Sequence, residues 1–216
     1  MHTKVNQLLE KSSVIFWDFD GVIKDSLEVK ASAFENLFLE YDQTILKKIK
    51  KHHLEFGGVS RFEKIPLYLD FVGITPTQIN IEKYIDKFSN IVKQSVIDSP
   101  WVPGVIDYIK SNYKTKQFIL VTATPKFEID EILMELGLTN FFLEVYGAPI
   151  SKTKALGLAI KKFRYDSKKT IMIGDSMSDY QAALNNDVAF VLRQTEFNIA
   201  LQNNLNCLIL RDFINE

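Results

Sequence analysis

The chain has 216 residues, of which 46% are hydrophobic and 25% charged, a composition that supports a full apolar core without disulfide or metal staples. Its 26 Lys and Arg residues against 27 Asp and Glu leave a net charge of −1, so charge gives no reason to expect nucleic acid or an anionic membrane as a partner. The single cysteine, Cys207, excludes an intrachain disulfide, and no apolar run has the length of a signal peptide or membrane span, so we expect a cytoplasmic protein.

The first predicted element is a buried strand at residues 14–17, a short β-favouring run that ends at a turn around Gly21. Only helices are predicted from there to Pro100. They cover residues 27–41, 44–54, about 60–73 and about 76–98. Ser60 and Glu63 have the spacing of a capping box at the start of the third of these helices.

Beyond Pro103 the predicted strands and helices alternate. The strands are residues 118–121, 143–146, 170–173, 188–192 and 207–210, and the helices between them are residues 105–112, 127–136, 152–163 and 178–186, the last capped by Ser178. This alternation is typical of a parallel sheet covered by helices on both faces. We therefore expect an α/β fold with a Rossmann-like core at residues 1–24 and 101–216, and an inserted four-helix cap domain at residues 25–100.

Polar groups follow four of the predicted strands. They are Asp18 and Asp20, Thr122, Lys152, and Asp175 with Asp179. Open parallel sheets bind ligands beyond the carboxyl ends of their strands, so these groups are expected to meet. A carboxylate can form a covalent phosphoryl intermediate, and Mg²⁺, lysine and hydroxyl groups can neutralise the charge on the phosphoryl oxygens. The sequence therefore predicts a phosphoryl-transfer site with Mg²⁺.

The order and spacing of these motifs resemble the haloacid-dehalogenase superfamily, and specifically its phosphoglycolate-phosphatase and β-phosphoglucomutase branch. The motifs are Asp18-x-Asp20-Gly-Val-Ile-x-Asp-Ser, then Leu-Val-Thr122, then Gly-Asp175-Ser-x-x-Asp179. The resemblance covers the whole chain, although the insertion matches only in being helical. It implies that Asp18 is the nucleophile and Asp20 the general acid and base. Thr122 and the Ala123 amide would hold the phosphoryl oxygens.

The resemblance also implies a metal site and an active-site lysine. Asp18, the Asp20 carbonyl, Asp175 and Asp179 would hold Mg²⁺. Many relatives carry Lys-Pro-x-Pro where this chain has Ser151-Lys152-Thr153-Lys154. Ser151 can cap a helix that starts at Lys152, which favours Lys152 as the lysine beside the nucleophile, with Lys154 as the alternative.

In this family the cap closes over the site and supplies substrate contacts. Arg61 is the best candidate for holding a second anionic group of the substrate, although a solvated helix charge explains it equally well. Lys30, on the first cap helix, is a second candidate.

The favoured function is a magnesium-dependent phosphatase that hydrolyses a small phosphorylated metabolite. A sugar phosphomutase would use the same aspartates and stays open, as does a non-catalytic phosphate-binding or interaction protein. A dehalogenase needs neither Asp20 nor the pair Asp175 and Asp179, which argues against it. A Schiff-base phosphonatase would need a cap lysine in the site, a role that Lys30 leaves open. The sequence identifies neither the substrate nor the oligomeric state.

Overall fold

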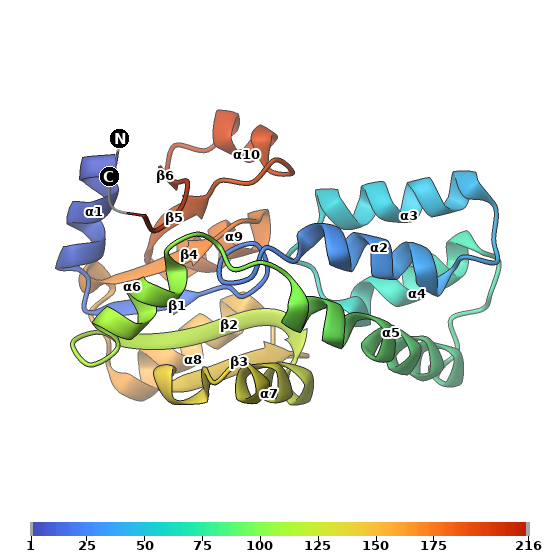
Figure 1. Ribbon diagram of the computed structural model, residues 1–216, viewed down its shortest axis with the longest axis horizontal. Helices are drawn as coiled ribbons and strands as arrows, with labels where there is room; N and C mark the ends of the chain where they lie inside the picture. The colour runs from blue at the N-terminus through green and yellow to red at the C-terminus, as the bar shows by residue number, and fades with distance from the viewer. Residues whose placement is uncertain (1, 215–216) are drawn as a thin grey trace.

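The computed structural model describes residues 2–214 and divides into a sheet-based core and a helical cap beside it (Figure 1). Within these residues the sheet has six parallel strands in the order β3-β2-β1-β4-β5-β6. The strands are β1 Val14–Trp17, β2 Gln117–Pro125, β3 Glu144–Ala148, β4 Thr170–Gly174, β5 Ala189–Arg193 and β6 Leu208–Leu210. The expected Rossmann-like α/β fold is confirmed.

Helices cover both faces of this sheet (Figure 1). In the core they are α1 His2–Lys11, α6 Val105–Asn112, α7 Lys126–Glu135, α8 Lys152–Phe163, α9 Met177–Asn185 and α10 Ile199–Asn204. Successive side chains of a strand point to opposite faces, so Ile15 and Trp17 belong to one apolar cluster and Val14 and Phe16 to the other. Because β1 is buried on both faces, its sequence is apolar at every position.

The cap consists of α2 Leu27–Leu37, α3 Gln43–Glu55, α4 Arg61–Phe71 and α5 Gln78–Asp98. Its core is aromatic: the Phe34 ring stacks on Phe88 with 3.9 Å between centroids and meets Tyr68 edge-on at 5.2 Å. The two chain segments that join cap and core run side by side, since the Asp25 amide donates to the Pro100 carbonyl at 2.8 Å. No helix within residues 2–214 combines the length and the apolar character that a membrane span requires.

Helices α6 and α8 have the bounds expected from the sequence, whereas several other expectations were wrong. Strand β2, expected to end before Thr122, extends to Pro125 and contains Thr122. The first cap helix ends at Leu37 instead of about Tyr41, because the amides of Phe38 and Tyr41 bond to carbonyls three residues back and the chain turns there. Ser60 caps α4 by accepting from the Phe62 amide, without the reciprocal bond from Glu63. The last long helix is capped by Ser176, two residues earlier than expected.

Candidate active site

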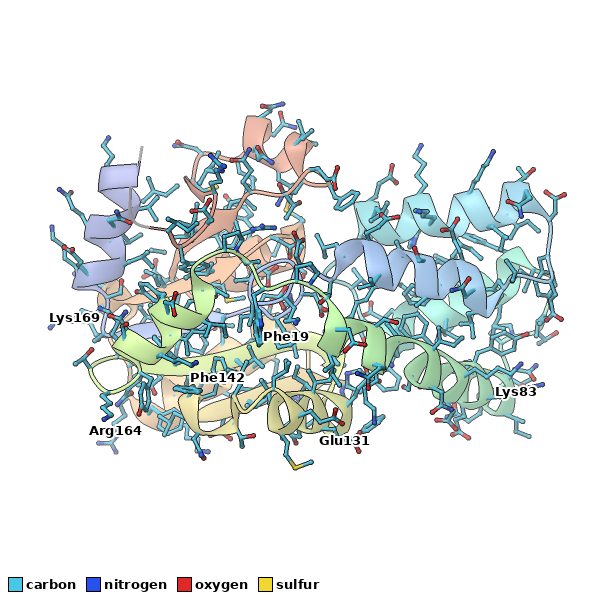
Figure 2. The ribbon with its side chains drawn as sticks, in the orientation of Figure 1. Phe19, Lys83, Glu131, Phe142, Arg164 and Lys169 are labelled. Atoms are coloured by element: carbon cyan, nitrogen blue, oxygen red, sulfur yellow. The ribbon has the colours of Figure 1, made fainter. Side chains whose placement is uncertain are left out.

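The carboxyl ends of β1, β2 and β4 lie side by side, and Asp18 lies at the centre of this edge. Its carboxylate is buried, with Oδ1 accepting from the Phe19 amide at 2.7 Å and Oδ2 from Lys152 Nζ at 2.6 Å. Figure 2 shows Phe19 near the boundary between the sheet and the cap helices. The expected nucleophile is therefore almost removed from bulk water and faces a lysine.

Lys152 reaches Asp18 from the first turn of α8, which Ser151 caps by accepting from the Lys154 amide at 3.4 Å. Its Nζ also donates to Asp179 Oδ1 at 2.7 Å. Burial alone would lower the pKa of Lys152, but Asp179 and Asp18 raise it above its ordinary value, so the group stays an ammonium. The Lys154 side chain is exposed. The structure thus brings Lys152, and not Lys154, to Asp18.

Three buried carboxylates, those of Asp18, Asp175 and Asp179, have oxygens that all lie within 4.8 Å of one another. Burial and then the charge of Asp179 raise the pKa of Asp18 to about 7, and burial and then Asp18 raise the pKa of Asp175 well above its ordinary value. Lys152 contacts two of the three carboxylates with a single positive charge. A divalent cation would supply the missing charge, and carboxylate oxygens are its preferred ligands, so these residues fit such an ion.

Local backbone geometry fixes the position of Asp179. Its Oδ2 accepts from the Ser176 amide at 3.2 Å and from the Ser176 hydroxyl at 2.5 Å, which anchors it at the start of α9. A Cβ on Gly174 would lie 2.2 Å from the Asp179 Cβ, so no larger residue fits there. Asp179 therefore serves both as a helix-capping acid and as a member of the carboxylate cluster.

Asp20 lies apart from this cluster and faces the cap. Its carboxylate accepts from Ser26 Oγ at 2.6 Å, from Lys30 Nζ and from Thr124 Oγ1 at 3.3 Å. Burial alone would raise the pKa of Asp20, but the charge and hydrogen bond of Lys30, helped by Ser26, lower it below its ordinary value. Asp20 is therefore ionised while the cap is closed. Lys30 contacts Asp20, and a contact of Lys30 with the substrate stays a prediction.

Thr122 and Ala123 line a second part of the site, a cavity of about 200 Å³ between the end of β2 and the cap residues Gly58 to Ser60. The Thr122 hydroxyl is buried and accepts from the Thr124 amide at 3.1 Å. Lys152 lines the same cavity. These groups, with Lys152 as the residue that contacts Asp18, therefore surround a space that can take a small ligand group.

Arg61 lies on the cap where α4 meets α7 of the core. Its guanidinium donates to both carboxylate oxygens of Glu128 at 2.6 Å and to Ser89 Oγ at 2.7 Å, and it lies over the Phe88 ring. Both side chains of the Arg61–Glu128 ion pair are buried. The structure thus uses Arg61 to join cap and core, and a substrate contact through Arg61 stays a prediction that requires it to leave Glu128.

Sequence reasoning missed three residues at the site. Ser26 and Thr124 hold Asp20, and Lys64 is a buried cap lysine on α4. Thr124 could have been predicted as a site residue, because it lies two residues beyond Thr122 and therefore on the same face of the strand end. Lys64 offered none, because a charged side chain in a surface helix is ordinarily exposed.

The raised acid pKa values predict how a divalent cation affects stability. Between pH 4 and the folded-state pKa of about 7, folded Asp18 keeps a proton that the unfolded chain has lost, so its contribution to the stability of the metal-free protein falls as pH rises. Ionised carboxylates bind the cation, so we expect saturating Mg²⁺ to raise the thermal midpoint by about 5–10 °C at pH 8 and by much less at pH 5. Differential scanning calorimetry measures both shifts.

The control for this prediction is Asp175→Asn, which keeps the size of the side chain and removes one ligand charge. Its midpoint should respond weakly to Mg²⁺ at both pH values. An equal stabilisation of the wild type at pH 5 and pH 8, or an undiminished response in the variant, would show that the carboxylate cluster does not bind the ion.

Comparison with known proteins identifies the family of the chain. Residues 14–192, which include all the aspartates of the site, match the family model for haloacid dehalogenase-like hydrolases. The chain belongs to this family. The resemblance seen in the sequence motifs is therefore confirmed. No curated protein matches the chain.

Solved structures of haloacid dehalogenase-like proteins share the fold over nearly the whole chain. A predicted phosphoglycolate phosphatase from Haemophilus somnus has a TM-score of 0.71 and 18% identity, covering 94% of this chain and 95% of the other. A β-phosphoglucomutase from Clostridium difficile has a TM-score of 0.72 and 19% identity, covering 94% and 92%. CbbY from Rhodobacter sphaeroides, solved with xylulose 1,5-bisphosphate, has a TM-score of 0.75 and 14% identity, covering 94% and 95%. At these identities the likeness concerns the fold.

Proposed function

We propose that this haloacid dehalogenase-like hydrolase is a magnesium-dependent phosphatase that acts on a small phosphorylated metabolite through an aspartyl-phosphate on Asp18. The observation that carries the proposal is the buried contact of Asp18 with Lys152, beside the carboxylates of Asp175 and Asp179. A nucleophile next to fixed positive charge, with ligands for a cation, is what transfer of a dianionic phosphoryl group requires.

In the proposed first step an Asp18 oxygen bonds to phosphorus while the bond from phosphorus to the ester oxygen breaks. Asp20, which Lys30 and Ser26 hold ionised in the free site, takes up a proton when the substrate binds and gives that proton to the departing alcohol. In the second step water attacks the same phosphorus, Asp20 takes a proton from that water, and the bond to Asp18 breaks to release inorganic phosphate. Asp20 lies two residues beyond the nucleophile and is held by Ser26 and Lys30, which orients it for both transfers.

Other groups of the site stabilise the transferring phosphoryl. Thr122 and the Ala123 amide line the small cavity with Lys152 and are proposed to donate to phosphoryl oxygens. Lys30 is proposed to contact the substrate as well, because its Nζ also donates to Thr124 Oγ1 at 2.9 Å near the end of β2. Mg²⁺ would be held by Asp18, the Asp20 carbonyl, Asp175 and Asp179, and when bound it neutralises charge on the phosphoryl oxygens.

A sugar phosphomutase is the second candidate function, and the contacts between cap and core support it. Besides the buried pair of Arg61 and Glu128, Ser178 Oγ donates to the Gly58 carbonyl at 3.1 Å. A Cβ on Gly58 would lie 2.1 Å from that hydroxyl, so the cap loop packs directly on the core. A tightly closed cap excludes water, which favours return of the phosphoryl group to a bound sugar.

The test is an assay of the purified protein with para-nitrophenyl phosphate and a panel of small sugar and acid phosphates, with Mg²⁺ and with a chelator. We expect release of inorganic phosphate that falls at least about 10-fold when the metal is removed. Chromatography of the products separates the candidates, because a mutase gives an isomeric sugar phosphate without net phosphate release. Neither product, across the panel and with Mg²⁺ present, would contradict both and favour a non-catalytic phosphate-binding protein.

A further inference from the structure

Lys64 is a buried cation without an acidic partner among residues 2–214. It lies in the first turn of α4, one turn after Arg61, and is 2% exposed. Its Nζ contacts His53 Nδ1 at 3.0 Å and the His53 carbonyl at 3.5 Å. An ammonium group removed from water is costly unless an anion compensates it.

The neighbouring cations are all compensated. Lys152 contacts Asp18 and Asp179, Lys30 contacts Asp20, and Arg61 contacts Glu128. Burial, followed by the charge of Lys30, lowers the pKa of Lys64 to about 7 although Asp20 and Asp175 raise it, so an anion bound close to Lys64 would favour its charged form. Lys64 is thus the cation around the described site whose partner is still to be supplied.

A cavity of about 450 Å³ extends from His53, the residue that Lys64 contacts, to the catalytic edge of the sheet. It lies between cap residues 53–59 and the core loops that follow β4 and β5, and both Asp175 and His53 line it. Most of its other lining is apolar, with Leu54, Phe56 and Phe197 among the residues. Its shape and lining suit a short carbon skeleton that extends from the reacting phosphate toward the cap.

His53 links Lys64 to this cavity. Burial, and then Lys64, lower the pKa of His53 well below its ordinary value, so the ring is neutral. When Lys64 is charged it donates to Nδ1, so the ring proton then lies on Nε2, and none of the hydrogen bonds found within residues 2–214 uses Nε2. The ring therefore has an N–H donor left for a ligand and a positive charge behind it.

We propose that His53 and Lys64 form a subsite for an anionic end-group of the substrate, opposite the phosphate that Asp18 attacks. The His53 Nε2–H donates to this anion, and Lys64 supplies the counter-charge through the ring. This rests on the proposed function and narrows its substrate class to phosphomonoesters with a second anionic group. Arg61, which the sequence favoured for such a contact, is occupied by Glu128, so the role falls to the cation one turn later.

The experiment uses calorimetric binding of short carboxyalkyl phosphonates of increasing length, each matched with an alkyl phosphonate of the same length, in the presence of Mg²⁺. We expect the wild type to prefer the carboxylate of the best length by at least about 10-fold, the value of one charge-assisted hydrogen bond. In Lys64→Met the preference for the carboxyalkyl phosphonate over the alkyl phosphonate should fall below about 3-fold. In Lys64→Arg part of the ratio should remain.

The matched control is Lys83→Met, which removes an exposed lysine at the outer part of the cap (Figure 2) and should keep the wild-type ratio. No preference at any length in the wild type, or an unchanged ratio in Lys64→Met, would overturn the subsite, and the first of these outcomes does not depend on the folding of a variant. Hydrolysis of the corresponding phosphates separates the two proposals. Turnover without a carboxylate preference rejects only the subsite, whereas a preference in binding without turnover rejects only the hydrolase.

Discussion

Asp18→Asn should lower kcat for release of inorganic phosphate by at least about 10⁴-fold. The amide has the size of the carboxylate but is not a nucleophile, so no phosphoryl intermediate can form. The fold should persist, because Lys152 keeps its contact with Asp179 and the substitution removes one of three mutually repelling acids. Steady-state assays of the purified variant with Mg²⁺ measure the loss.

The control for this substitution is Asp86→Asn, on the exposed face of α5 in the cap, which should retain wild-type activity. Thermal melts of both variants exclude unfolding as the cause of a loss. In metal-free buffer at pH 8, Asp18→Asn should melt no lower than the wild type, since burial and Asp179 raise the pKa of the acid that it replaces. Full activity in a folded Asp18→Asn protein would contradict the assignment of Asp18 as the nucleophile.

The arrangement of the acidic groups was predictable from sequence because it follows from the topology of a parallel sheet. The sequence predicts parallel strands whose carboxyl ends share one edge of the sheet, and Asp18 and Asp175 meet there because β1 and β4 are neighbours. Lys152 was predictable for a local reason, since a serine cap fixes the start of α8 and therefore the direction of its first turn. Both inferences depend on backbone geometry that a short stretch of sequence determines.

The contacts of the cap depend on tertiary packing and were not predictable in the same way. Arg61 and Glu128 are far apart in the chain, and nothing in either local sequence indicates that α4 and α7 touch. Lys64 has the sequence context of an exposed helix lysine, and only the packing of α4 against His53 of α3 buries it. Specificity in this fold is therefore harder to predict from sequence than the chemistry.

Short helices at the two ends of the chain show a related limit. Helix α1 packs Val5, Leu8 and Leu9 against the core at helical spacing, but this pattern covers little more than one turn and was not recognised as a helix. Helix α10 has only six residues, and none of them is buried. Packing on the core beside them stabilises both helices, so their formation depends on tertiary contacts more than on local sequence.

Asp20→Asn should give the second large loss, about 10²–10⁴-fold in kcat, because it removes the group that transfers both protons. The contacts from Ser26 and Lys30 to Asp20 keep its pKa below the ordinary value, so the carboxylate is ready to accept the proton of the hydrolytic water. The amide cannot accept that proton, and the aspartyl-phosphate on Asp18 should accumulate. Rapid acid quench followed by mass spectrometry of the protein measures this intermediate, with Asp86→Asn as the control.

The leaving group separates proton transfer by Asp20 from a merely structural role. Nitrophenolate departs without a proton, whereas an alkoxide does not, so the phosphorylation step in Asp20→Asn should slow far more with an alkyl phosphate than with para-nitrophenyl phosphate. Single-turnover kinetics with both substrates isolate this step. Loss of positioning alone would slow both substrates alike, because Ser26, Lys30 and Thr124 surround the side chain whichever alcohol departs. Equal losses would therefore assign Asp20 to holding the cap, and the proton donor would have to be found elsewhere.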